Sequence, residues 1–128
     1  MYLGTDMKKW KYTEEGGTQN WCWALGSCSY VKEAVRVSEG LMKEHNLKPS
    51  STRKNGKNTP FSNHDYRPEL DASEFCNDTL CTVYQNLIGI LRWTCELGRI
   101  DVLHETAILS QYLAQPRIGH LTQCLNIF

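Results

Sequence analysis

The amino-acid sequence predicts a mixed α+β fold, with strands at the N-terminus and helices after them. Two segments near the start alternate between apolar and polar residues around a Gly-Gly pair, and the second half repeats apolar residues at helical spacing. The first pattern is typical of a β-hairpin and the second of amphipathic helices. We therefore expect a β-hairpin, a helix, an irregular linker and a C-terminal helical segment, spanning residues 1–26, 27–45, 46–78 and 79–128 respectively.

The hairpin prediction rests on the segments "YLGTDMKKWKY" and "QNWCWAL", which flank "EEGGT". Each segment places aromatic or aliphatic side chains at loosely alternating positions, and glycine supplies the backbone freedom that a tight turn needs. This pattern favours the half-buried edge of a sheet. Because an isolated two-stranded hairpin is only marginally stable in water, we expect this one to depend on a partner.

A single amphipathic helix is predicted after the hairpin. Ser27 or Ser29 can cap it, and we expect it to end near His45. Its apolar side chains fall on one broad face and its charged side chains elsewhere, which predicts a packing helix with a charged outer surface. Residues 46–65 contain turn-forming residues without apolar periodicity, so they are expected to form an irregular linker.

A helical hairpin is predicted over residues 79–115. Asp78 or Thr79 can cap its first helix, in which apolar residues recur every three or four positions. Gly98 is placed to end that helix, because glycine readily adopts the left-handed conformation that follows many helices. Asp101 can then cap the second helix of the pair.

A third helix is predicted near the C-terminus. Pro116 and Gly119 are expected to break the preceding helix, and the new one begins near His120 and continues to the last residue. Since no stop signal follows, we expect the domain to be truncated at both ends. The last helix would then lack the partner for its apolar face, formed by Leu121, Leu125 and Phe128.

Composition limits the possible functions. The 128 residues include 41% hydrophobic and 22% charged residues, which is a globular composition, and 14 basic residues balance 14 acidic ones. A free-standing nucleic-acid binder usually has a basic excess. The basic residues are unevenly distributed along the chain, however: residues 1–60 contain ten Lys and Arg residues and six acidic ones. The most basic stretch, 43–57, is better explained as a solvated linker than as a phosphate-binding strip.

Neither a membrane segment nor a signal peptide is expected. The apolar run at 87–93 is far shorter than the roughly 20 residues that a span requires, and the N-terminus lacks an apolar core region. We therefore expect an intracellular protein that is not secreted, with its six cysteines reduced. Cys22, Cys28 and Cys95 lie in partly apolar surroundings and are expected to be small buried residues.

The spacings Cys76-x4-Cys81 and His120-x3-Cys124 are ones that a zinc site could use. The pairs lie 38 residues apart without the turn-forming residues of a zinc knuckle, and Cys124 falls on an apolar helix face. A Cys–His nucleophilic pair has no better support, since nothing activates a particular thiol. We therefore predict no metal site and no catalytic residues.

Four blocks in order carry a resemblance to a known family. They are "YLGTDM", "WALGSCSYVKEAV", "YRPELD" followed by "YQNLIGILRW" and "LGRID", and "LSQYLAQPRIGHL". Together they resemble the pol polyprotein of copia-type (pseudoviral) LTR retrotransposons, at the C-terminal end of the reverse transcriptase domain. The family's structural motif falls here on Tyr84, Leu87, Gly89, Leu91, Trp93, Arg99, Asp101, Pro116 and His120.

The resemblance implies a primer-grip-like hairpin, a thumb-like helix and a connection towards ribonuclease H. A polymerase of this family holds two Mg²⁺ ions on carboxylates, partly from a Tyr-x-Asp-Asp turn that would lie before residue 1, and this chain contains no Asp-Asp pair. The ribonuclease H carboxylates would lie beyond residue 128. The chain is thus expected to be a catalytically inactive relic that needs no cofactor and lacks the palm and ribonuclease H portions as partners.

An alternative is a residual or domesticated module that binds nucleic acid or another protein. In the family, the primer grip and the thumb helix lie along the backbone of the primer–template. By that resemblance, weak affinity for nucleic acid is expected from Tyr2, Leu3, Gly4, Lys8, Lys9, Lys11 and Lys32. Arg99 and Asp101 lie at a junction between two helices, where an ion pair is expected to be structural.

Overall fold

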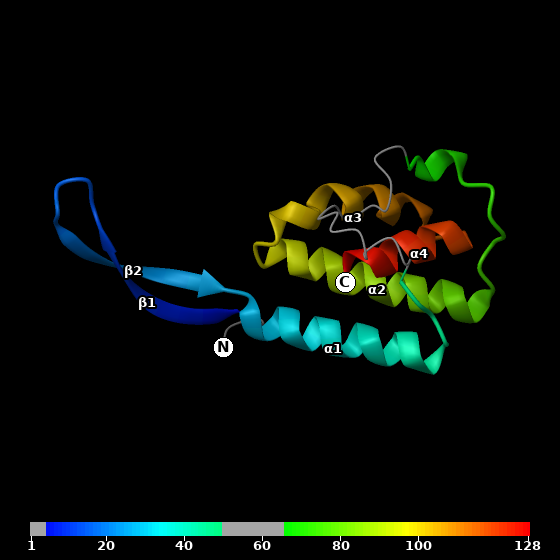
Figure 1. Ribbon diagram of the computed structural model, residues 1–128, viewed down its shortest axis with the longest axis horizontal. Coiled ribbons are helices and arrows are strands. Elements are labelled where there is room, and N and C mark those ends of the chain that lie inside the picture. The colour runs from blue at the N-terminus through cyan, green and yellow to red at the C-terminus, as the bar shows by residue number, and fades with distance from the viewer. Residues whose placement is uncertain (1–4, 50–65) are drawn as a thin grey trace.

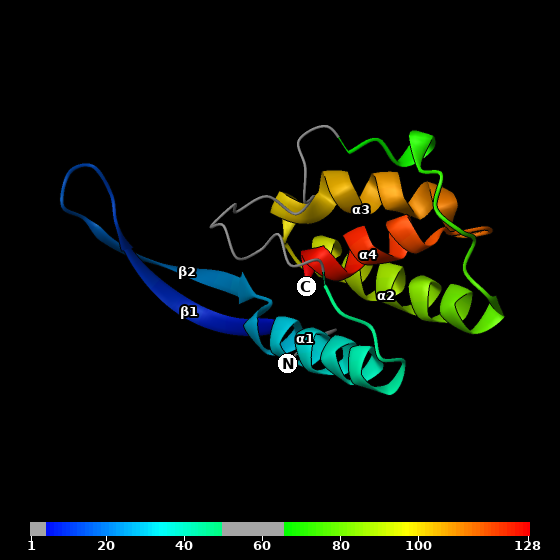
Figure 2. The ribbon, with the colours of Figure 1, turned by 45° about the vertical axis from the view of Figure 1, so that its right-hand side comes forward.

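The structure is a computed structural model that describes residues 5–49 and 66–128. It confirms the mixed α+β class: an antiparallel hairpin of β1 (Asp6–Thr13) and β2 (Gln19–Gly26) precedes four α-helices. In Figures 1 and 2 the hairpin extends away from the helices, which pack together beside one another. The molecule therefore has an extended N-terminal part and a packed C-terminal part.

The hairpin forms where the alternating segments predicted it. Asp6 pairs with Gly26 at its base and Thr13 with Gln19 at its tip, with no shift of register between them. Gly17 adopts a φ of 82° in the turn, a conformation that glycine adopts without strain. Among the described residues, β1 and β2 pair only with each other, and no other described strand extends this sheet.

Helix α1 (Cys28–Glu44) matches its predicted range to within one residue. Ser27 occupies its N-cap position, although no side chain caps the helix there. Ser29 instead donates hydrogen bonds to the carboxylate of Asp6, which ties the start of α1 to the start of β1. In Figure 2 the helix lies beside α2 (Asp78–Glu96).

Helix α2 is the longest helix and contributes most of the core. Asn77, rather than Asp78 or Thr79, caps it: its side-chain oxygen accepts a hydrogen bond from the Leu80 amide at 2.8 Å. Asparagine caps helices as well as aspartate does, so the predicted type of capping residue was correct, but its position was one residue too late. Gly98 ends the helix as predicted, with a φ of 108°.

The second helix of the predicted hairpin is shorter than expected. The chain forms a 3-10 turn, η3 (Ile100–Val102), then α3 (Leu103–Leu109) and a second 3-10 turn, η4 (Ser110–Tyr112). Asp101 does not cap α3, because it lies inside η3 with its carboxylate on Arg99. The prediction of that cap was wrong because Arg99, two residues earlier, occupies the same carboxylate oxygens.

Helix α4 (Ile118–Ile127) begins two residues before His120. Gly119 does not break a helix, since it lies within the first turn of α4. A Cβ there would lie 1.8 Å from an oxygen of Asp71, so glycine is needed for close approach. Leu121 and Leu125 are buried in the core, and Phe128 packs against it. The expectation that this face lacks a partner was therefore wrong.

The core lies between α2, α3 and α4. Its buried members are Val83, Tyr84, Leu87, Ile88, Leu91, Leu109, Leu121, Cys124 and Leu125. The predicted linker is only partly irregular: residues 66–78 include the 3-10 turn η2 (Pro68–Leu70) and pack onto the start of α4, while 50–65 lie outside the described residues. Among the described residues, no helix is long and apolar enough to cross a membrane.

Candidate nucleic-acid interface

The hairpin has two unlike faces, and one of them joins cations to aromatic rings. Residues directly opposite each other in a β-ladder project from the same face, and the register places Lys9 opposite Trp23 and Lys11 opposite Trp21. The Lys9 ammonium lies 5.6 Å from the centroid of the Trp23 ring, and that of Lys11 lies 5.7 Å from the Trp21 ring. We call this the Lys/Trp face; Met7 and Leu25 continue it towards the base.

The aromatic rings of the Lys/Trp face are unusually open to solvent. Trp21 is 63% exposed and Trp23 is 65% exposed, whereas large apolar side chains usually avoid water. Met7 and Leu25 are also exposed. Contiguous exposed apolar surface of this kind indicates a site of interaction.

The opposite face of the hairpin is less basic, although it also carries two aromatic residues, Trp10 and Tyr12. Lys8 lies opposite Ala24, Trp10 opposite Cys22, and Tyr12 opposite Asn20. Near the tip, the Glu14 carboxylate accepts a hydrogen bond from the Asn20 amide at 2.9 Å. Of the three lysines predicted in the hairpin, the structure thus places Lys9 and Lys11 together and Lys8 apart from them.

The two cations of the Lys/Trp face are not neutralised by a described carboxylate. The ladder positions on that face are Met7, Lys9, Lys11, Thr13, Gln19, Trp21, Trp23 and Leu25, none of them acidic. Asp6, on the other face, is held by Ser29; the hydrogen bond from the Ser29 hydroxyl lowers the pKa of the Asp6 carboxyl below its usual value. The Lys/Trp face therefore carries net positive charge.

The remaining predicted contact residues are not joined to this face. Lys32 is exposed on α1, and no described interaction links it to the hairpin. Tyr2, Leu3 and Gly4 lie outside the described residues. Trp21 and Trp23 were missed as site residues; the alternation in "QNWCWAL" was the available signal, but only the strand register sets them opposite the lysines.

The motif residues of α2 serve the core. Tyr84, Leu87 and Leu91 are buried, and the Tyr84 hydroxyl donates a hydrogen bond to the Leu109 carbonyl at 2.7 Å. Burial is the main cause that raises the pKa of the Tyr84 phenol. Gly89 lies on the exposed side of the helix, and Trp93 is also exposed. These positions stabilise the helical part and bring no reactive groups together.

Arg99 and Asp101 form the predicted ion pair. Two hydrogen bonds of 2.8 and 2.7 Å join the guanidinium to the carboxylate. The hydrogen bond from Arg99 is the main cause that lowers the pKa of the Asp101 carboxyl. Because the Arg99 and Asp101 side chains are 43% and 59% exposed to solvent, the pair contributes little to stability. Its role is the structural one expected from the sequence.

Pro116 and His120 belong to a polar cluster that holds the 66–76 segment against α4. The His120 ring is buried; its Nδ1 accepts a hydrogen bond from the Arg117 amide, and its Nε2 lies 2.9 Å from the Pro68 carbonyl oxygen. The Pro116 carbonyl accepts a hydrogen bond from the Cys76 amide at 2.9 Å. Both ring nitrogens of His120 are thus engaged in holding the fold.

Asp71 is the centre of the same cluster. It accepts hydrogen bonds from the Tyr66 hydroxyl at 2.7 Å and from the Ser73 amide and hydroxyl. Burial favours a higher pKa for this carboxyl, but the hydrogen bonds from Ser73 and Tyr66 outweigh burial and the net pKa is lowered. Asp71 is therefore ionised near neutral pH and acts as an acceptor within the fold.

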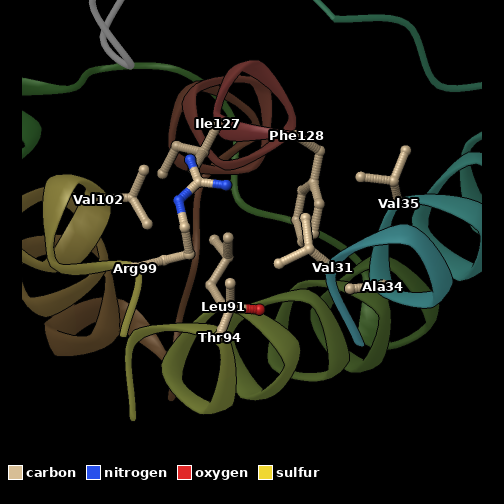
Figure 3. Close-up of a pocket in the computed structure, with 9 residues that line it drawn as sticks. All are labelled: Val31, Ala34, Val35, Leu91, Thr94, Arg99, Val102, Ile127 and Phe128. Carbon is tan, nitrogen blue, oxygen red and sulfur yellow. The ribbon is translucent and has the colours of Figure 1, made fainter. Parts of the chain in front are cut away.

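A pocket of about 220 Å³ opens between α1, α2 and the end of α4. Figure 3 shows the Arg99 side chain reaching into it near Ile127. The other lining residues are Val31, Ala34, Val35, Leu91, Thr94, Val102 and Phe128. Since Asp101 already pairs with Arg99, the pocket is apolar with one neutralised cation, and it points to no particular ligand.

The cysteines do not assemble a reactive site. Cys95 and Cys124 are buried, whereas Cys22 and Cys28 are exposed, so the expectation that both of these are buried was wrong. Burial raises the pKa of the Cys124 thiol well above its usual value. Within residues 5–49 and 66–128, no group of three His, Cys, Asp or Glu could hold a metal ion.

Comparisons with known proteins found no match: no family model, curated protein or solved structure is significantly similar to this chain.

Proposed function

We propose that the chain is a non-catalytic segment of a copia-type reverse transcriptase, and that its hairpin contacts nucleic acid. The observation that carries this proposal is the Lys/Trp face, where two cations stand over two exposed indole rings. Lysine ammonium groups neutralise phosphates, and exposed aromatic rings offer surfaces for bases. The four sequence blocks that resemble the family support the same assignment.

The proposed segment has no polymerase activity by itself. Nucleotide transfer requires carboxylates that hold two metal ions at the reacting phosphate, and the sequence contains no Asp-Asp pair. We place the protein inside the cell, with palm and ribonuclease H portions of a parent polyprotein as its partners. Purified protein given primed RNA, nucleotides and Mg²⁺ is expected to extend no primer; metal-dependent extension above a blank would refute this part of the proposal.

Binding to nucleic acid is tested by fluorescence anisotropy with two labelled probes, a primer–template duplex and an unpaired oligonucleotide. We expect the protein to bind at least one of them with the weak, salt-sensitive affinity of non-specific binders, on the order of 10⁻⁴–10⁻⁶ M. The variant Lys9→Glu/Lys11→Glu is expected to lose about tenfold or more. Each reversal replaces attraction to phosphate with repulsion, so the loss should shrink as salt is raised.

The matched control is Lys43→Glu/Lys48→Glu, which makes the same change in net charge away from the hairpin. Both control residues are exposed, one at the end of α1 and one after it. The control is expected to change affinity by less than about twofold. An equal loss in both variants would indicate general electrostatic attraction, including to the basic stretch at 43–57, and would remove the hairpin from the proposal.

The flanking DNA tests the relationship to the family independently of binding. Codons for a Tyr-x-Asp-Asp turn upstream, or a ribonuclease H reading frame downstream, would support descent from a pol polyprotein. A reading frame with its own promoter and neither neighbour would instead favour a domesticated binding module.

A further inference from the structure

We propose that the Lys/Trp face binds an unpaired nucleic-acid strand in preference to a duplex, with two bases stacked on Trp21 and Trp23 and their phosphates near Lys9 and Lys11. This inference rests on the proposed function and specifies its ligand. It follows from three features of the face: the spacing of the two rings, their exposure, and the absence of carboxylates from its ladder positions.

The spacing of the rings excludes a stacked duplex. Trp21 and Trp23 are two residues apart on one strand, which corresponds to roughly 6.8 Å along an antiparallel strand. Successive nucleotides of a duplex strand are about 3.4 Å apart, and their base faces are covered by their neighbours. Two neighbouring bases reach both rings only if they separate from each other. An unpaired strand can do this, whereas a duplex would have to melt.

Displacing the two lysine ammonium groups from the rings by bases costs little free energy. An exposed cation–π contact of the kind made by Lys9 and Lys11 corresponds to a factor of roughly two to five in an equilibrium constant. Stacking of one base on an aromatic side chain corresponds to a factor of roughly five to 150. Base stacking is therefore more favourable than the lysine–ring contact that it replaces. Each flexible lysine side chain stays beside its ring, where its ammonium group can neutralise a phosphate.

Two other occupants are less compatible with the charges. A second copy of the face would bring the lysines of both copies together, and like charges placed opposite each other are destabilising. An anionic membrane surface would favour cations around a central apolar patch. Here the two cations form a row on β1 directly beside the two rings on β2, in the middle of the face, and the apolar pair Met7 and Leu25 lies at one end.

The opposite face supplies a control inside the same hairpin. Trp10 is 62% exposed, much like Trp21 and Trp23, but its neighbour on that face, Tyr12, is only 40% exposed, and no described cation–π contact joins a lysine to either ring. A Trp10→Val variant thus removes an equally exposed indole from an equivalent strand. Valine is suitable for all of these positions because it favours β-strands.

The experiment compares a labelled thymidine oligonucleotide of about ten nucleotides, within the range of single-strand binding platforms, with a duplex of equal length. We expect the single strand to bind at least tenfold more tightly. Trp21→Val/Trp23→Val should weaken single-strand binding about tenfold or more and leave duplex binding unchanged. Trp10→Val should change either affinity by less than about twofold.

Two further measurements distinguish a loss of base stacking from a loss of the fold. Trp21→Phe/Trp23→Phe keeps aromatic surfaces and should restore most of the affinity that the valine variant loses. For two phosphate contacts, the logarithm of the binding constant should fall with the logarithm of salt at a slope of about −1.4. Lys9→Gln/Lys11→Gln should flatten that slope.

Equal affinity for the two probes, or loss caused equally by the valine and phenylalanine variants, would overturn the single-strand inference and leave the proposed function standing. Binding to neither probe would reject both. Tighter binding to phosphatidylserine vesicles than to the oligonucleotide, or a dimer that dissociates in Trp21→Val/Trp23→Val, would assign the face to another occupant and overturn the inference.

Discussion

The hairpin and the helical part of this chain use apolar residues in opposite ways. Trp21 and Trp23 of the hairpin are each more than 60% exposed, whereas Leu87 and Leu109 of the helical part are fully buried. Both parts show the apolar periodicity of their element, yet only the helices cover one another. Periodicity therefore predicts the local structure, but the neighbours decide whether an apolar face becomes a core or a binding surface.

The same difference separates stability from binding. Each β-strand of the hairpin has one hydrogen-bonded neighbour, and a two-stranded sheet alone is marginal. The helical part buries a cluster of nine side chains drawn from α2, α3 and α4. We conclude that the helices supply most of the stability, while the hairpin leaves its apolar side chains exposed, as the proposed binding to nucleic acid requires.

Hydrogen exchange should show the largest difference between the two parts. Amides of α2 within 83–95 are expected to exchange only through global unfolding, and those of 19–26 through local opening at a much smaller free energy. The protection factors should therefore differ by several powers of ten, in protein shown to be monomeric. Equal protection of both segments would mean that the hairpin has a stabilising partner, and it would contradict the division drawn here.

Leu87→Ala should lower the free energy of unfolding by about 2–5 kcal/mol, because it leaves a cavity in the core that the surrounding helices fill only partly. Urea unfolding followed by circular dichroism measures this loss. Leu103→Ala is the matched control, since Leu103 is also in a helix but is 50% exposed; its effect should stay below about 1 kcal/mol. A similar loss in both variants would show that Leu87 contributes no more to the core than Leu103 does.

Asp71 should produce a smaller, pH-dependent effect. Its folded-state pKa is lowered, so the unfolded state binds its proton more readily and its contribution is present above the unfolded pKa, near 4. That contribution is lost as the pH falls through the lower, folded-state pKa. Between pH 5 and 2, the urea midpoint of the wild type should fall more than that of Asp71→Asn. Parallel midpoints would show that this carboxylate does not couple folding to pH.

Much of the local structure could be predicted because its causes are local. The Gly-Gly turn, the helix that begins at Cys28 and the left-handed Gly98 follow from residues within a few positions of one another. The adjacent Arg99–Asp101 pair was also predictable. The cap of α2 was misplaced by one residue because Asn77 and Asp78 have similar capping preferences.

The larger errors arose where distant segments meet. The 66–76 segment contains turn-forming residues and was expected to be part of an irregular linker, but its Asp71 packs against Gly119 of α4. Leu121 and Leu125 were expected to lack a partner because the last helix showed no stop signal, but they pack in the core against α2. For the candidate site, sequence and resemblance supplied the lysines, while the Lys/Trp pairs required the strand register.

By itself, the sequence determined the type and order of the elements, the charge balance and the absence of an Asp-Asp pair, because each depends on composition or on short-range spacing. Tertiary structure decided which apolar faces are covered. Burial depends on contacts between segments far apart in the chain, which local periodicity does not encode. Tertiary packing buries the apolar face of α4 against the other helices and leaves Trp21 and Trp23 in solvent beside two lysines.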